Sequence, residues 1–328
     1  MTDKLTAKDF TTSEEVRWCP GCGDFAILKA VTAALADVGA RPETTAFVSG
    51  IGCAARLPYY LETYGFHTIH GRAPAIATGL KLANPDLDVW VVTGDGDGLS
   101  IGGNHLMHAL RRNIGIKILL FNNEIYGLTK GQFSPTSRTG TTSPSSPSGS
   151  LDTPISPGQF ALGSGARFYA RAIDIDKTGM GSVLQQAHAF RGTSFIEILQ
   201  NCIVYNDKVF AEITARESAA QTQLHVRHGE PLLFGNNRDK GIRFNARSFT
   251  LDVVDATRSN DDILVHDEGN AVIARLLIDM RMPVALGVIY RQPAQSYEDA
   301  FYAHHPSRMQ RTKSVTDFIK GPNTWTVK

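Results

Sequence analysis

The chain has 328 residues, of which 42% are hydrophobic and 20% are charged. This composition is typical of a soluble globular protein with a large buried core, and it excludes an intrinsically disordered chain. The formal net charge of +1 provides no general attraction to nucleic acid or to an anionic membrane surface, so we expect neither as a partner.

The N-terminal residues 1–18 lack the apolar core of a secretory signal. No uninterrupted apolar run approaches the roughly 18 residues that a membrane-spanning helix needs. We therefore expect a cytoplasmic protein. In that reducing compartment, the Cys-x-x-Cys pair at residues 19–22 is more typical of metal ligands or of a redox pair than of a structural disulfide.

Strand-like and helix-like segments alternate along the first two thirds of the chain. Apolar periodicity predicts helices over residues 25–38, 102–113 and 181–192. Runs of β-branched and aromatic residues predict strands within residues 44–55 and 88–98, each stopping at a glycine turn, and within 114–127, ending in a polar loop. Residues 167–176 and 193–206 are two more strand candidates. This alternation predicts an α/β fold with a parallel sheet covered by helices on both faces, and ligands at the carboxyl ends of its strands.

Two later segments are less regular. Residues 134–158 are rich in Ser, Thr, Pro and Gly, and we predict an ordered loop over the site rather than a linker between domains. Beyond residue 206 the alternation weakens. Residues 274–290 predict one helix and one strand, and the rest predicts an extended C-terminal arm. We therefore divide the chain into a site-bearing region, 1–205, and a C-terminal region, 206–328.

The most informative motif is "GDGDG" at residues 94–98, which follows a strand and precedes "NN" at the end of the next predicted strand. Glycines allow the backbone to approach a phosphate, and Asp95 and Asn123 supply the oxygen ligands that Mg²⁺ prefers. An Asp that only stabilises its own turn is the simpler alternative. A dinucleotide site at "GIGCAA", residues 50–55, is disfavoured because the motif is followed by Pro58, which is poor in an opening helix.

The GDG…NN pairing resembles the thiamine diphosphate-binding motif, and four strings around it resemble the beta subunit of 2-oxoacid:ferredoxin oxidoreductases. These strings are "CPGCGD" (19–24), "SGIGC" (49–53), residues 70–113 and "NNEIYGLTKGQ" (122–132). The resemblance covers roughly residues 15–205 and extends weakly into residues 290–299.

The resemblance implies a thiamine diphosphate-binding fold, an alpha subunit as partner in a dimer of alpha–beta units, and electron transfer through a 4Fe–4S cluster to ferredoxin. It implies oxidative decarboxylation of a 2-oxoacid with coenzyme A. It places Mg²⁺ on Asp95, Asn123 and the backbone carbonyl of Ile125. The residues expected around the cofactor are Gly52, Cys53, His70, Gly94, Asp95, Gly96, Asp97, Asn123, Ile125 and Gly127. The resemblance also places the activating carboxylate on the alpha subunit, so the chain alone is expected to be inactive.

The four cysteines, Cys19, Cys22, Cys53 and Cys202, form a complete ligand set for a cubane cluster or for structural zinc, and their spacing alone does not separate the two. Thiamine chemistry favours the cluster, because electrons left after decarboxylation need an acceptor and no nicotinamide or flavin motif is visible. A non-redox thiamine decarboxylase with zinc, or a zinc scaffold without activity, are the alternatives.

Three residues are candidates for contact with substrate. His70 lies in "HGRA" at a strand-to-helix transition, where it is either a catalytic donor or a structural hydrogen-bond partner. Arg56 and Lys130 lie in the predicted site loops and could pair with the second carboxylate of 2-oxoglutarate, or be solvated charges. The string "LTKGQ" resembles members that act on 2-oxoglutarate, which we therefore favour over pyruvate. His225 and His228 are interpreted as a solvated pair.

Overall fold

The computed structural model describes residues 5–258 and 262–306, together with residues 316, 319 and 325. Within them the chain builds one large sheet of eight strands. The strands, in order across the sheet, are β2 (Tyr64–His67), β1 (Thr45–Ser49), β3 (Asp88–Gly94), β4 (Ile116–Asn122), β6 (Ser194–Leu199), β5 (Phe168–Ile173), β11 (Val284–Arg291) and β7 (Gln223–Val226).

The sheet is parallel from β2 to β5 and then reverses. Strand β11 pairs with β5 in antiparallel orientation, and β7 runs parallel to β11. These two strands come from beyond residue 206, so the C-terminal region completes the sheet of the site-bearing region. The predicted helix and strand within residues 274–290 are confirmed as α9 (Ala271–Asp279) and β11.

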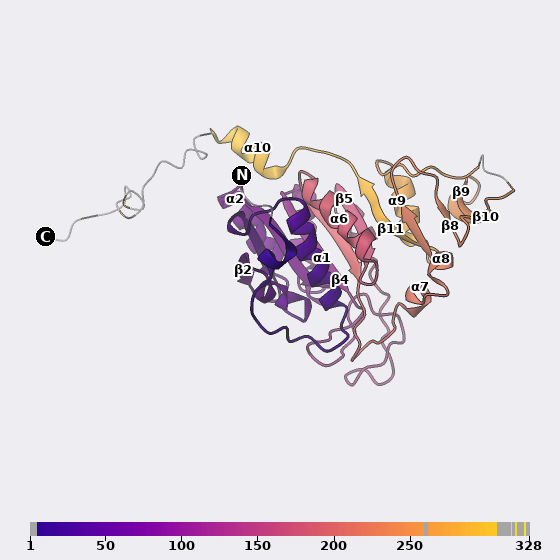
Figure 1. Cartoon of the computed structure of the whole chain (residues 1–328), viewed down its shortest axis with the longest axis horizontal. Helices are drawn as coiled ribbons and strands as arrows, with labels where there is room; N and C mark the ends of the chain where they lie inside the picture. The colour runs from indigo at the N-terminus through magenta and orange to yellow at the C-terminus, as the bar shows by residue number, and fades with distance from the viewer. Residues whose placement is uncertain (1–4, 259–261, 307–315, 317–318, 320–324, 326–328) are drawn as a thin grey trace.

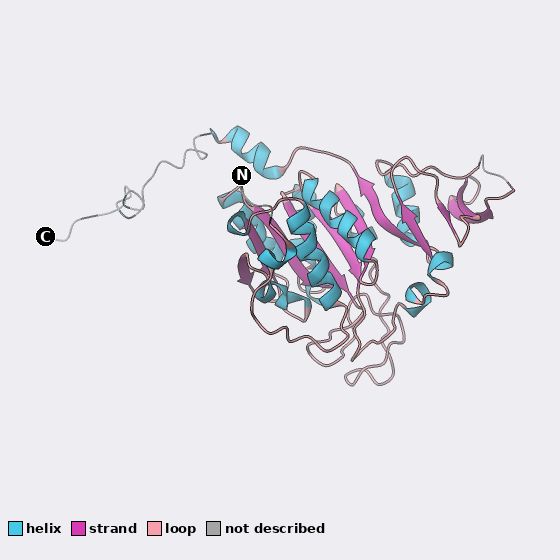
Figure 2. Ribbon diagram, viewed as in Figure 1, coloured by secondary structure: helices cyan, strands magenta, loops and turns pink. Residues whose placement is uncertain are grey.

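Helices cover both faces of the sheet, as the alternation predicted (Figure 2). On β4, Leu119 and Phe121 join the core beneath one helical layer, while Ile118 and Leu120 join the core beneath the other, because successive side chains point to opposite faces. The first layer holds α1 (Asp24–Asp37), α6 (Lys177–Ala189) and the short helices η1 (Ala7–Phe10) and η3 (Ala54–Tyr60). The second holds α2 (Ala73–Ala83), α4 (Gly103–Arg112), α5 (Pro157–Gly163) and α9.

A second, three-stranded antiparallel sheet lies at the end of the molecule farthest from β2 (Figure 1). It contains β8 (Leu233–Phe234), β9 (Lys240–Asn245) and β10 (Thr250–Asp255). The remaining short elements are η2 (Pro42–Thr44), α3 (Asp95–Leu99), α7 (Ala211–Thr214) and α8 (Ala219–Thr222). None of the helices in the described part of the chain is long and apolar enough to cross a membrane.

The chain after β11 runs back across the sheet as an arm that ends in α10 (Tyr297–His304) (Figure 1). The backbone amide of Gln292 donates to the carbonyl of Arg167 at 2.8 Å, and the Glu298 carboxylate accepts from the amide of Gly115 at 3.0 Å. The last part of the expected C-terminal arm lies outside the described residues.

A buried ion pair connects the middle of the sheet to the loop after β4. Glu197 on β6, 2% exposed, accepts from Arg171 Nε on β5 at 2.8 Å and from the side-chain amide of Asn122 at 2.8 Å; the Tyr169 hydroxyl also donates to it. Burial opposes the charged form, but the Arg171 guanidinium and these hydrogen bonds hold the pKa of Glu197 below its usual value. Glu197 thereby holds Asn122, the last residue of β4, in place.

Replacing Glu197 by Ala should lower the free energy of unfolding by about 3–5 kcal/mol, because it leaves the buried Arg171 guanidinium without its counter-charge. Urea unfolding followed by circular dichroism measures the loss. Glu43→Ala is the control, since Glu43 pairs with Arg41 on the exposed surface and its removal should change stability little. Equal losses in the two variants would contradict this role for Glu197.

Candidate functional site

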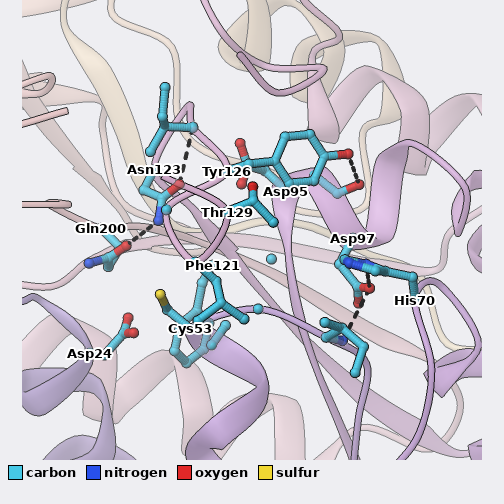
Figure 3. A pocket seen from close by; sticks show the side chains of 18 residues that line it. Asp24, Cys53, His70, Asp95, Asp97, Phe121, Asn123, Tyr126, Thr129 and Gln200 are labelled. Atoms are coloured by element: carbon cyan, nitrogen blue, oxygen red, sulfur yellow. Dashed lines mark hydrogen bonds and ion pairs between the residues drawn. The ribbon is translucent and has the colours of Figure 1, made fainter. Parts of the chain in front are cut away.

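A cleft opens where β1, β3 and β4 end (Figure 3). This is the edge at which ligands bind in parallel sheets. The structure brings all the predicted cofactor-binding residues to its lining, namely Gly52, Cys53, His70, Gly94, Asp95, Gly96, Asp97, Asn123, Ile125 and Gly127. The lining also includes residues that the sequence did not single out, among them Asp24, Tyr126, Thr129 and Gln200.

Asp97 holds three loops of the cleft together. Its Oδ1 accepts from the backbone amides of Ile51 at 3.2 Å and Gly71 at 2.9 Å and from His70 Nδ1 at 2.8 Å, while the Thr93 hydroxyl donates to Oδ2 at 2.6 Å. The carboxylate is 3% exposed. It therefore organises the protein around the cleft with both of its oxygens.

The close approach of β1 to Asp97 requires a glycine. A Cβ on Gly50 would lie 1.9 Å from Asp97 Oδ2, a distance that no side chain could tolerate. The first glycine of "SGIGC", Gly50, is thus explained by the close contact between its backbone and the Asp97 carboxylate.

His70 lies beside Asp97 at the wall of the cleft (Figure 3). Because a carboxylate only accepts, His70 Nδ1 is the donor of their 2.8 Å hydrogen bond. This bond orients the ring and leaves Nε2 for a group in the cleft. The arrangement suits the predicted role of His70 as a donor or acid near a ligand.

Asp95, two residues before Asp97, is held differently. It is 2% exposed, and the hydroxyls of Ser134 and Thr136 each donate to its Oδ2 at 2.5 Å. Burial raises the pKa of Asp95 to about 6, although these hydrogen bonds oppose the rise. The contacts attach the start of the Ser/Thr-rich segment to Asp95. No residue of 134–158 is in the lining of the cleft, so a loop that covers the site stays a prediction.

The turn after β4 is locked over the GDG loop. Asn123 Oδ1 accepts from the amide of Ile125 at 3.2 Å, and its Nδ2 donates to Gln200 Oε1 at 2.8 Å (Figure 3). The Tyr126 hydroxyl donates to the carbonyl of Gly96 at 2.9 Å, and a Cβ on Gly96 would lie 2.2 Å from the Tyr126 ring. The cleft thus combines glycine backbone, a carboxylate and a side-chain amide oxygen. The two oxygen ligands fit Mg²⁺, and the glycine backbone fits the close approach of a diphosphate.

The four cysteines line a second cavity of about 760 Å³, together with Asp24, Asn123, Gly127 and Gln200, which also line the cleft. Cys53 belongs to both linings. A Cβ on Gly127 would lie 3.5 Å from the Cys202 sulfur and 3.6 Å from the Cys53 sulfur, so the β4 turn passes directly between the two sites.

The four thiols lie near one another at this cavity. Burial, the neighbouring Asp24 carboxyl and the other thiols raise the pKa of Cys53 to about 12. Tetrahedral zinc takes up to four thiolates, and a cubane cluster takes one thiolate on each of its four irons, so this set of cysteines fits either group.

Asp24 is a residue that the sequence reasoning missed. It opens α1 directly after the Cys-x-x-Cys pair and is 1% exposed, and neither of its oxygens has a hydrogen-bond partner in the described chain. Burial raises its pKa to about 7. It lines both the cleft and the cysteine cavity. A signal was present, since an acid within "CPGCGD" begins an otherwise apolar helix.

Neither of the two predicted substrate-binding cations is in the lining of the cleft. Arg56 lines the cysteine cavity and donates from Nε to the Tyr60 hydroxyl at 3.1 Å. Lys130 is exposed, with a left-handed backbone (φ 76°), directly after Leu128 and Thr129 of the cleft lining.

The prediction for the two surface histidines is confirmed. The side chains of His225 and His228 are 52% and 59% exposed, and each lies near a single aspartate, Asp176 at 3.7 Å and Asp267 at 3.9 Å.

Comparisons with known proteins agree with this geometry. Residues 50–198 match the family "Thiamine pyrophosphate enzyme, C-terminal TPP binding domain". The chain is 49% identical to 2-oxoglutarate oxidoreductase subunit KorB of Mycobacterium tuberculosis, across 98% of this chain and 88% of that relative. It is 46% identical to the beta subunit of 2-oxoacid:ferredoxin oxidoreductase 1 of Aeropyrum pernix, across 60% and 61% of the two chains.

A solved structure extends the agreement to the whole fold. The 2-oxoglutarate:ferredoxin oxidoreductase of Magnetococcus marinus, solved with 2-oxoglutarate, coenzyme A and succinyl-CoA bound, superposes with a TM-score of 0.77 at 28% identity. The match covers 98% of this chain and 97% of that one. The predicted α/β fold of thiamine diphosphate-binding enzymes is thus confirmed.

The unpaired carboxyl of Asp24 should make stability depend on pH. A carboxyl whose folded pKa is raised binds its proton more tightly in the folded state, so stability falls as pH rises from about 4 to about 7. Asp24→Asn should reduce this fall, to which the raised pKa of Asp95 also contributes, and it should be more stable than wild type at pH 8 by up to a few kcal/mol, with a smaller difference at pH 5. Urea unfolding of the metal-free chain measures both values.

Asp37→Asn, at the exposed end of the same helix, is the matched control and should leave the pH dependence intact. A wild-type chain whose stability does not fall between pH 5 and pH 8 would contradict the buried, unpaired state of Asp24.

Proposed function

Because this chain belongs to the beta subunits of 2-oxoacid:ferredoxin oxidoreductases, we propose that it acts with an alpha subunit on 2-oxoglutarate. In the proposed reaction, 2-oxoglutarate and coenzyme A give succinyl-CoA and carbon dioxide, and the two electrons released pass through a 4Fe–4S cluster to ferredoxin. The observation that carries the proposal is the shared wall between the cleft and the cysteine cavity. Electrons released in the cleft then need to cross only that wall.

The residues of the cleft suit thiamine diphosphate, which supplies the carbanion-stabilising centre for decarboxylation. Asp95, Asn123 and the carbonyl of Ile125 would hold Mg²⁺ against the diphosphate, and the glycines of the GDG loop would let the backbone approach it. His70, oriented by Asp97, would present Nε2 to the reacting carbons as a hydrogen-bond donor or acid.

We favour a cluster over zinc, because the electrons left after decarboxylation need an acceptor. All four cysteines line one cavity, and a cubane bound by Cys19, Cys22, Cys53 and Cys202 would meet the cleft at Cys53. Four reduced cysteines fit the reducing cytoplasm in which we place the protein.

The alpha subunit would cover the cleft. Large apolar side chains are exposed at its lining and next to it, including Leu128 (52% exposed), which lines the cleft, and Ile69 (66%), next to His70. Apolar surface of this kind marks a protein–protein interface. The partner would bring the carboxylate that activates thiamine, and two alpha–beta units would associate. The chain alone would then bind cofactors without turning over.

Two variants should separate the two cofactors. Asp95→Ala should lose bound thiamine diphosphate, because a metal ligand is removed, while it keeps about four iron and four sulfide per chain. Cys202→Ser should lose iron and keep thiamine diphosphate, since Cys202 lines only the cysteine cavity. Iron, acid-labile sulfide and thiamine assays on anaerobically purified complex provide the readout. Stoichiometric zinc in place of iron would reject the redox proposal and favour a non-redox decarboxylase.

The preference for 2-oxoglutarate rests on two relatives whose names carry that substrate and on the cations near the cleft. A second carboxylate buried without a cation would be costly. Lys130 follows the lining residues Leu128 and Thr129, and Arg56 lies beyond Cys53, so each is proposed as its partner.

Lys130→Met or Arg56→Met should lower kcat/KM for 2-oxoglutarate at least about tenfold, equal to about 1.4 kcal/mol, while kcat/KM for 2-oxobutyrate changes little. Steady-state reduction of ferredoxin with each substrate measures both. Lys208→Met, which removes an exposed lysine outside both cavity linings, is the control. Equal losses on both substrates would make the residue a general component of the site, and a wild-type preference for pyruvate would overturn the substrate assignment.

A further inference from the structure

The segment that follows the β4 turn inserts two hydroxyl groups into the interior beside the GDG loop. Ser134 and Thr136 are 2% and 5% exposed, and the segment between them and α5 reaches the surface, where Leu151 is 92% exposed. Polar side chains this deeply buried need hydrogen-bond partners. Both lie 2.5 Å from the same acceptor, Asp95 Oδ2, and the Thr136 hydroxyl oxygen also lies 3.0 Å from Asn122 Oδ1.

The two carboxylate oxygens of Asp95 have different surroundings. Both hydroxyls donate to Oδ2, so that oxygen carries two short, charge-assisted hydrogen bonds. Asp95 itself lines the cleft, and its other oxygen, Oδ1, remains for a ligand there. A carboxylate held in this way presents one oxygen in one orientation, which suits the strict octahedral geometry of Mg²⁺.

The hydroxyls are fixed by the protein and do not depend on a bound metal for their position. The amide of Ser134 donates to Ser137 Oγ at 2.7 Å, and the Ser137 hydroxyl donates to the carbonyl of Glu124 in the β4 turn. Arg138 Nε then pairs with the Glu124 carboxylate at 3.0 Å. The segment is thereby attached to the same turn that carries Asn123.

We propose that Ser134 and Thr136 are positioning residues for Mg²⁺, which act by fixing Oδ2 of Asp95 so that Oδ1 alone coordinates the metal. The inference deepens the proposed function and rests on it. Residues that orient a metal ligand commonly contribute 10- to 100-fold to metal affinity. Loss of either hydroxyl should therefore raise the Mg²⁺ concentration that thiamine diphosphate binding needs, which can be measured without turnover.

The test is equilibrium dialysis of thiamine diphosphate against the assembled alpha–beta complex over a series of Mg²⁺ concentrations. Ser134→Ala and Thr136→Val should each raise the half-saturating Mg²⁺ concentration about tenfold, and the double variant more. Saturating Mg²⁺ should restore the wild-type stoichiometry of thiamine diphosphate. Thr136→Ser keeps the hydroxyl and should stay near wild type.

Thr139→Val is the matched control, because Thr139 lies in the same segment and its hydroxyl donates to the carbonyl of Asp152. A double variant whose Mg²⁺ requirement stays within twofold of wild type would overturn the proposal. So would a Thr136→Ser variant as impaired as Thr136→Val, since packing would then explain the loss. If Thr136→Val does not fold, Ser134→Ala, which deletes a single hydroxyl, decides. A wild-type complex that binds no thiamine diphosphate at any Mg²⁺ concentration would instead reject the proposed function.

Discussion

The site depends on one buried carboxylate, that of Asp97, which forms hydrogen bonds to the backbones of separate loops. Asp97 accepts from the amides of Ile51 and Gly71, which follow β1 and β2, and from Thr93, which lies on β3. The carboxyl ends of these strands would otherwise leave amide groups unsatisfied in a buried place, at a cost of about 1–3 kcal/mol each. The loops of the cleft are thus held in register by this one side chain.

Asp95 and Asp97 have identical side chains but different hydrogen-bond partners. Asp97 has both oxygens bonded within the protein, whereas Asp95 has both of its hydroxyl donors on one oxygen. Both carboxylates lie in the short helix α3 and line the cleft, but they have different partners within the protein. The motif "GDGDG" therefore contains two acids, two positions apart, of which Asp97 joins the loops of the cleft and Asp95 joins the segment after β4.

Much of the fold was predictable because its signals are local. Buried strands such as β3 and β4 read as continuous apolar runs, and the glycines and polar residues at their ends marked the site. The strand predicted within residues 44–55 stops at its glycine turn as predicted, since β1 ends at Ser49, before the turn at Gly50 beside Asp97 and the short helix η3. The small sheet of β8, β9 and β10 was not predicted, because short, half-exposed strands leave little periodicity.

The parts of the site that were missed depend on long-range contacts. Ser134 and Thr136 lie in a segment whose composition resembles a linker, and only folding brings them to Asp95, about 40 positions earlier in the chain. Asp24 is buried by packing between two cavities, and its sequence neighbours do not show which of its oxygens lack partners. The spacing of residues in the sequence predicted which residue types come together at the site. The hydrogen-bond partners of each side chain depend on packing between distant segments.

The reversal of the sheet at β11 has a consequence for synthesis on the ribosome. Strand β5 is fully buried in the finished sheet, yet the partner on its outer edge is made about 110 residues later. Until β11 emerges, the nascent chain carries an apolar strand with an open row of amides and carbonyls, which is the kind of edge that other chains can add to. The site-bearing strands therefore need protection by a chaperone, or by rapid completion of translation, during that interval.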